Sequence, residues 1–265
     1  MLTFIGMGLH DERGISLRGL EESRASDHIY SEFYTSLMPG LSVKNLEQLL
    51  GKPVQVLSRT DIEEKAEENV LKLAKNSKVV LLVPGDSMTA TTHIDLRLRA
   101  AKLGIKTVLI HGVSAISAVI AATGLQSYKF GRTVTVPLVD EGPPKETPYN
   151  VIKENSDRGL HTLVLLDVKA DLGRYMSIRE ALEQLLVVEQ KRRELVTHHD
   201  RLVVGAARVG ADDMVIKGGR VRDLINYEFG GPPHSLIFPG RLHFVEVETL
   251  QVFAHADIEA MEANL

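Results

Sequence analysis

Hydroxyl and carboxylate side chains follow a wholly apolar run in the stretch VVLLVPGDSMTATTHIDLRLRA, residues 79–100. The run Val79–Val83 is typical of a buried strand, and Asp86 follows it directly after a proline and a glycine. Aspartate often forms a turn or caps a helix at such a position. Open α/β sheets, however, bind ligands at the carboxyl ends of their strands. Asp86 is therefore predicted either as a turn residue or as part of a pocket rim.

Three further polar residues have the same two interpretations. Ser114 follows the predicted strand Ile105–His111 and could cap the next helix, but polar groups at the ends of two strands favour a shared pocket. Asp167 ends another apolar run, where a turn or capping role is the alternative. His234 follows the stiff sequence Gly230-Gly231-Pro232-Pro233, which either presents it to a ligand or holds a sheet edge.

Several familiar catalytic and binding motifs are incomplete. Gly6-Met7-Gly8 follows the first strand, but Asp11 stands where a dinucleotide fingerprint needs a third glycine, and no Walker lysine is present. A tight turn with close backbone approach to a ligand and a plain turn both remain open. His198-His199 is an adjacent pair in a polar setting, without metal-ligand spacing. No G-x-S-x-G nucleophile motif occurs. We expect no metal site.

Composition limits the class of protein. The 265 residues are 44% hydrophobic and 25% charged, with a net charge of −4. This balance gives no electrostatic sign of nucleic-acid or membrane binding. The absence of cysteine excludes disulfides and thiolate chemistry. The amino-terminal sequence MLTFIGMGLH lacks the pattern of a signal peptide, so we expect a cytoplasmic protein.

The first half of the chain alternates strand and helix patterns, which predicts an α/β fold with a mostly parallel sheet covered on both faces. Predicted strands, including a second buried strand at PVQVLS, span residues 2–8, 53–58, 79–83 and 105–111. Predicted helices span residues 44–51, 60–76 and 92–103, the second opened by Thr60 and Glu63 in capping-box spacing.

The pattern changes after residue 113, and we predict two α/β domains, 1–113 and 114–265. A small-residue helix at 114–124 precedes a strand and the proline-rich loop Glu141–Pro148, predicted to be mobile or variable. A buried strand at Leu160–Val168 leads to the longest helix, 177–195, with Ser177 and Glu180 as a capping box. Short strands are predicted at 201–210, 214–219, 234–240 and 242–248, which suggests a mixed sheet.

Long blocks of the sequence resemble one family. These blocks run from Met1 to about Glu248 and include FIGMGL, SEFYTSLMPG, VLSR, VPGDSMTATTHIDLRLRA, YKFG, VIKENSDRGLHTLVLLDVKA and GGPPHSLIFPGRLHFVE. They are similar to the diphthine synthases, S-adenosyl-L-methionine-dependent methyltransferases of the tetrapyrrole methylase superfamily. The compact length and charged helices suit an archaeal member.

The resemblance implies an active-site cleft between the two domains and a homodimer. It also implies that S-adenosyl-L-methionine is held folded in that cleft, mostly by backbone groups, which would explain the incomplete glycine fingerprint. One position departs from the family pattern, because relatives commonly have proline where Ser87 follows Asp86. The positions that match the family's cofactor contacts are Leu9, Asp86, Thr89, Ser114, Ala115, Leu166, Val209 and His234.

The reaction implied by the resemblance is repeated methylation of the amino group on a modified histidine (3-carboxy-3-aminopropyl-histidine) of translation elongation factor 2, releasing S-adenosyl-L-homocysteine. Alignment of amine, methyl carbon and sulfur would supply much of the acceleration, and the sequence does not identify a general base. Two other functions stay open: methylation of a corrin or porphyrin precursor, and a non-catalytic ligand-binding regulator on the same scaffold.

Overall fold

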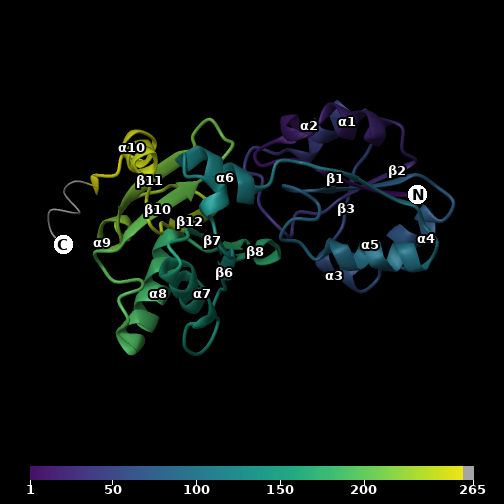
Figure 1. The fold of residues 1–265 in the computed structure, drawn as a ribbon. Coiled ribbons are helices and arrows are strands. Elements are labelled where there is room, and N and C mark those ends of the chain that lie inside the picture. Colours follow the sequence, from purple (N-terminus) through teal and green to yellow (C-terminus); the bar gives the residue numbers. More distant parts are fainter. Residues whose placement is uncertain (259–265) are drawn as a thin grey trace. The chain divides into compact units, whose positions relative to one another are not determined.

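The computed structural model describes residues 1–258, apart from the side chain of Asp171. The chain divides into two compact units (Figure 1). The first contains residues 1–115 and 169–174, and the second contains residues 116–168 and the chain from Tyr175 onward. The sequence-based boundary at residues 113 and 114 stays a prediction.

The first unit is built on a five-stranded sheet in which every pair is parallel, as the sequence predicts. The strand order β3-β2-β4-β1-β5 brings β4 and β1 to the centre. All five carboxyl ends therefore lie along one edge of the sheet, where ligands bind in open α/β folds. The strands are β1 (Leu2–Gly6), β2 (His28–Ser31), β3 (Gln55–Val56), β4 (Val79–Val83) and β5 (Thr107–Ile110).

Helices cover both faces of this sheet, which explains why its central strands β1 and β4 are buried throughout (Figure 1). Strand β4 sends Val79, Leu81 and Val83 into one buried cluster and the alternating Val80 and Leu82 into the other. The helices on one side are α1 (Leu17–Arg24) and α2 (Val43–Leu50), and those on the other are α3 (Arg59–Glu63), α4 (Val70–Ala74) and α5 (His93–Lys102).

Two sequence predictions for the first unit are wrong in detail. The expected buried strand at 53–58 is the exposed, two-residue β3, since it pairs only with β2 at the sheet edge. The expected helix 60–76 is two short helices, and its capping box joins Ser58 and Asp61 rather than Thr60 and Glu63. Strand β2, between β3 and β4, was not predicted from the sequence.

The second unit contains a mixed five-stranded sheet, as predicted, in the order β11-β10-β12-β7-β6. Only the β6–β7 pair is parallel. The strands are β6 (Val134–Val136), β7 (Thr162–Leu166), β10 (Leu202–Ala207), β11 (Val215–Arg220) and β12 (His234–Phe238), and a separate ribbon pairs β8 (Val168–Lys169) with β9 (Arg174–Tyr175).

Helix α8 begins after the predicted capping box, in which Ser177 and Glu180 bond to each other's backbone. Helix α7 was not predicted, and it shortens the predicted 141–148 loop because Thr147 and the buried Pro148 open the helix. The predicted strand 242–248 is wrong, because His243 and Glu246 form a capping box that starts a helix there. The helices are α6 (Ala115–Thr123), α7 (Thr147–Asp157), α8 (Ile178–Arg192), α9 (Val221–Leu224) and α10 (Phe244–Phe253).

Among residues 1–258, no helix is both long enough and apolar enough to cross a membrane.

Candidate functional site

Three glycines bring the loops after β1, β4 and β5 into direct backbone contact. A Cβ atom added to Gly6 would lie 2.5 Å from both the Gly85 carbonyl oxygen and the Gly112 nitrogen. A Cβ atom on Gly112 would lie 2.4 Å from the same Gly85 oxygen. These distances leave no room for a side chain at positions 6 and 112. We call this contact between Gly6, Gly85 and Gly112 the glycine junction.

The first turn is also tied to the β4 loop by backbone hydrogen bonds. The Gly85 N–H donates to the Gly8 carbonyl oxygen at 2.7 Å, and the Gly8 N–H donates to the Gly85 carbonyl oxygen at 3.2 Å. Both glycines have positive φ, +81° at Gly8 and +70° at Gly85. The backbone of the first turn therefore lies close to the loop after β4.

Asp86 is buried beside this junction, and both of its carboxylate oxygens accept hydrogen bonds. Oδ1 accepts from the Met88 N–H at 3.0 Å and from the Thr89 hydroxyl at 3.1 Å. Oδ2 lies 2.7 Å from Nδ1 of His111. Burial raises the pKa of Asp86, but these donors outweigh it and hold the pKa below its usual value. The turn interpretation of Asp86 is thus correct for Oδ1, whereas Oδ2 binds a second loop.

Sequence reasoning missed His111 as a site residue. It directly follows β5, and its imidazole is 72% exposed although Nδ1 is bound to the buried Asp86. The available signal was its position, because a histidine at the carboxyl end of a parallel strand lies on the ligand-binding edge.

A buried cluster of hydrogen-bonded side chains adjoins the same edge and was also missed, since β2 was not predicted. Glu32 follows β2, and its carboxylate accepts from the backbone N–H of Tyr34 and Thr35, from the Thr35 hydroxyl, and from Nε2 of His93 at 3.0 Å. Glu32 and His93 are both fully buried. In the part of the chain that the structure describes, the buried Ser87 hydroxyl and Nδ1 of His93 have no hydrogen-bond partner.

The predicted cofactor contacts of the first unit lie in the three loops joined by the glycine junction. Leu9 follows the Gly8 turn, and Thr89 lies in the loop after β4, where it is bonded to Asp86. Ser114 and Ala115 lie between β5 and the body of α6. All of them are partly exposed except Asp86, which is 6% exposed.

The predicted contacts of the second unit lie at one edge of the mixed sheet. Leu166 ends β7, and Val209 lies two residues beyond the end of β10. His234 begins β12, which runs antiparallel to both strands and pairs with Ala207 at this position. The topology therefore brings these three predicted residues to the same sheet edge.

The side chain of His234 is engaged within the protein. Its Nε2–H donates to the Gly231 carbonyl oxygen at 3.1 Å, and Nδ1 accepts from the Ile178 N–H at 3.4 Å. Burial lowers the pKa of His234, which keeps the imidazole neutral. The ring of His234 is therefore held by groups of the protein itself, and its contact with a ligand stays a prediction.

The remaining side-chain predictions concern Asp167 and the candidate metal ligands of the described residues. The Asp167 carboxylate accepts from the backbone N–H groups of Leu138 and Val168, so it ties the loop after β6 to the end of β7 rather than forming the predicted turn or cap. The residues that the structure describes contain no cluster of three or more side chains able to hold a metal ion.

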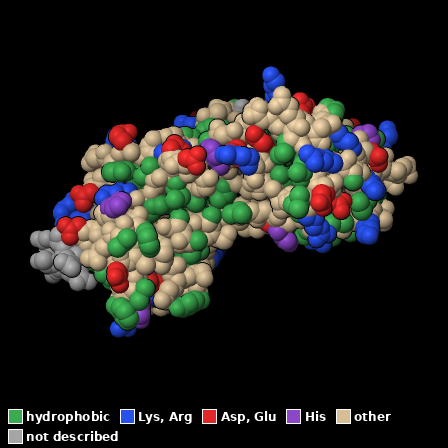
Figure 2. All heavy atoms as spheres, turned by 90° about the horizontal axis from the view of Figure 1, so that it is seen from above, with side chains coloured by type: hydrophobic (Ala, Val, Ile, Leu, Met, Phe, Trp, Pro, Cys, Tyr) green, Lys and Arg blue, Asp and Glu red, His purple; other side chains and the backbone are tan. Residues whose placement is uncertain are grey.

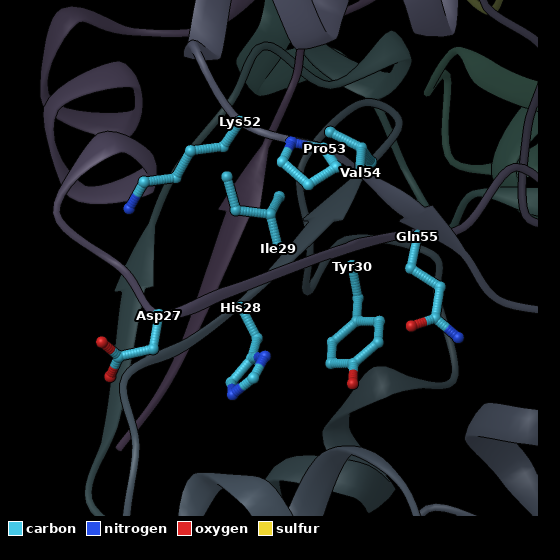
Figure 3. Close-up of a pocket in the computed structure, with 8 residues that line it drawn as sticks. All are labelled: Asp27, His28, Ile29, Tyr30, Lys52, Pro53, Val54 and Gln55. Atoms are coloured by element: carbon cyan, nitrogen blue, oxygen red, sulfur yellow. The ribbon is translucent and has the colours of Figure 1, made fainter.

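A pocket of about 280 Å³ lies away from these residues, at β2 and β3 (Figure 3). It begins at the amino end of β2, whereas Asp86 and Ser114 follow the carboxyl ends of their strands. Its lining shares no residue with the predicted cofactor contacts: Asp27, His28, Ile29, Tyr30, Lys52, Pro53, Val54 and Gln55.

Open space lies beside the backbone at two of the strand ends. A Cβ atom added to Gly85 would meet nothing closer than the Val113 carbonyl oxygen at 3.9 Å, so open space lies beside this turn. In the second unit, a Cβ atom on Gly231 would meet no atom within 4 Å. Space is thus open beside the backbone near Asp86 and near His234.

Comparisons with known proteins agree over nearly the full length. The family model for Tetrapyrrole (Corrin/Porphyrin) Methylases matches residues 1–225. Diphthine synthase from Methanosarcina mazei is 50% identical over 268 residues, which cover 99% of each chain. The Methanocella arvoryzae diphthine synthase is 47% identical over 254 residues, 96% of this chain and 98% of the relative. A crystal structure of diphthine synthase superimposes with a TM-score of 0.88 at 40% identity, covering 98% of both chains.

Proposed function

Because the chain belongs to the diphthine synthases of the tetrapyrrole methylase family, we propose that it methylates translation elongation factor 2 in diphthamide biosynthesis. The acceptor is the amino group of the modified histidine on that factor, and the methyl donor is S-adenosyl-L-methionine. The 50% identity over 99% of both chains carries this proposal, because fold similarity alone does not identify a substrate.

S-adenosyl-L-methionine supplies a methyl group that is bonded to a sulfonium sulfur. When the methyl group is transferred, the sulfur departs with the electron pair of the broken carbon–sulfur bond. The chain has to hold the donor and to orient the acceptor amine towards it. Such alignment can contribute about 7–11 kcal/mol to lowering a barrier. The glycine junction supports this role, because loops packed backbone against backbone are held rigidly for positioning a ligand.

The proposed cofactor contacts come from both units. In the first, they are Leu9, Asp86, Thr89, Ser114 and Ala115, in loops that the glycine junction holds together. In the second, they are Leu166, Val209 and His234 at the edge of the mixed sheet.

Mass spectrometry of elongation factor 2 tests the proposal. The factor carrying the unmethylated side chain is incubated with enzyme and S-adenosyl-L-methionine, and each methyl group adds about 14 Da to the modified peptide. Calorimetry measures cofactor binding separately. Binding without methylation would contradict the proposal and favour a regulator, whereas methylation of a porphyrin precursor alone would favour the other family activity.

The proposal extends to assembly and location. The substrate is a translation factor, which supports action in the cytoplasm. The homodimer is proposed from the resemblance to the family. Acidic and basic side chains are interspersed on the face in Figure 2, so that face gives no sign of a nucleic-acid-binding surface. Light scattering coupled to size-exclusion chromatography should give the mass of two chains, and a single-chain mass would overturn the dimer.

A further inference from the structure

An exposed histidine is hydrogen-bonded to a buried carboxylate at the carboxyl edge of the first sheet. The two atoms, Nδ1 of His111 and Oδ2 of Asp86, are 2.7 Å apart. The His111 side chain is 72% exposed, whereas that of Asp86 is only 7% exposed. One side of the imidazole therefore faces a fixed protein acceptor, and the other side is accessible to a ligand.

This contact determines which ring nitrogen carries the proton. An ionised carboxylate only accepts hydrogen bonds, so Nδ1 of the neutral imidazole donates and Nε2 keeps its lone pair. The donors on Oδ1, the Met88 N–H and the Thr89 hydroxyl, fix the orientation of the Asp86 carboxylate. The lowered pKa of Asp86 keeps it ionised at neutral pH. His111 is consequently held with a basic nitrogen on its exposed side.

The backbone that carries His111 is fixed as well. Gly112, the next residue, belongs to the glycine junction and packs against the turn that leads into Asp86. Ser114, two residues further on, is one of the proposed cofactor contacts. The first unit therefore holds His111 and Asp86 in one packed arrangement with the loops that carry the proposed cofactor contacts.

His93 and His234, also near the strand ends, do not offer such a nitrogen. His93 is fully buried and donates to Glu32, whose carboxylate accepts four hydrogen bonds including this one. Both ring nitrogens of His234 are bonded within the protein.

We propose that His111 is the general base of the reaction and that Asp86 orients it; this inference rests on the proposed function. An amine is protonated near neutral pH and has no lone pair for attack until it loses a proton. The proton passes from the substrate nitrogen to Nε2 of His111, which forms the new N–H bond and becomes imidazolium beside Asp86. The freed amine lone pair is then available to the methyl carbon. Release of the Nε2 proton to water restores the neutral ring.

Single-turnover methylation of elongation factor 2 tests the proposal. His111→Ala should slow the reaction about 10²–10⁴-fold, the usual contribution of general-base catalysis. Calorimetry should show unchanged affinity for S-adenosyl-L-methionine, and added imidazole should restore part of the lost rate. A variant rate equal to wild type, or a slow rate explained by lost cofactor affinity, would overturn the proposal.

Asp86→Asn tests the orienting role without removing the base. An asparagine amide can donate to Nδ1, which moves the ring proton to Nε2 and removes the exposed lone pair. Long-range ¹H–¹⁵N NMR of the free enzymes should report the Nδ1–H tautomer of His111 in wild type and its loss in the variant. An Nε2–H tautomer in wild type would contradict the inference independently of any turnover.

His199→Ala is the matched control, because His199 is an exposed histidine that the proposal does not use. It should methylate at the wild-type rate and show no response to imidazole. If the wild-type enzyme does not methylate the factor, the proposed function fails. If the wild-type enzyme methylates the factor and His111→Ala methylates it at the same rate, only the assignment of His111 fails.

Discussion

Gly112 occupies a position where three loops of the first unit meet and where a methyl group has no space. Its added Cβ atom would lie 2.4 Å from the Gly85 carbonyl oxygen and 2.6 Å from the Gly6 carbonyl carbon, both backbone atoms. Backbone cannot rotate aside as a flexible side chain can, so the loops would have to separate. The junction therefore explains glycine at this position by steric exclusion.

Gly112→Ala should consequently weaken cofactor binding and reduce stability. Overpacking of this kind costs about 1–3 kcal/mol of unfolding free energy. Separation of the loops would displace Asp86 and Ser114 together, so we expect lower affinity for S-adenosyl-L-methionine by calorimetry as well as a lower Tm.

Gly104→Ala is the control for a destabilising glycine substitution away from the junction. Gly104 follows α5 with a φ of +70°, and its added Cβ atom would meet nothing within 4 Å. Strain at this position should lower the Tm but leave cofactor affinity intact. Equal affinity losses in both variants would show that the junction has no special role in binding.

At the scale of elements, α10 shows how a tertiary contact decides between strand and helix. The segment LHFVEVE is rich in valine and phenylalanine, which favour strands. In the structure, Glu246 and Leu250, four residues apart, are the buried residues of α10, while Phe244 is 74% exposed. The buried residues therefore have the spacing of a helix and not that of a strand.

Glu246 connects α10 to distant parts of the second unit. Its carboxylate accepts from Lys129 Nζ, from Nε2 of His161, and from the backbone N–H groups of Gln126 and His243. Burial raises the pKa of Glu246, but these donors outweigh it and lower the pKa to about 2. The carboxylate is thus ionised and fully buried at neutral pH.

Glu246→Gln should destabilise the protein by about 3–5 kcal/mol, because it leaves buried donors and a lysine without their anion. Glu248→Gln, on the same helix but exposed, should change stability by no more than about 0.5 kcal/mol. Urea unfolding monitored by circular dichroism measures both. A small effect of Glu246→Gln would show that the network contributes little net stability.

At the scale of the whole molecule, the sequence predicts what depends on local pattern. The apolar run Val79–Val83, the Ser177–Glu180 capping box and the two sheet types were predicted and confirmed. Contacts between loops far apart in sequence were not predicted. Asp86 and His111 are 25 positions apart, and Glu32 and His93 are 61 apart, so no local spacing reveals either pair.

Stability of the whole molecule should fall in two stages on acidification. Burial lowers the pKa of both His161 and His234, so below pH ~6.5 the unfolded chain binds more protons than the folded one. The stability that the two neutral histidines allow is present above that pH. It is lost as the pH falls towards the pKa values that they have in the folded protein. Below pH ~4.5 the depressed pKa of Glu246 adds a second loss, which continues towards its folded value of about 2. The Tm measured by circular dichroism should therefore be lower at pH 5.5 than at pH 7.5, and lower again at pH 4. An equal or higher Tm at pH 5.5 would mean that other titrating groups outweigh these two histidines.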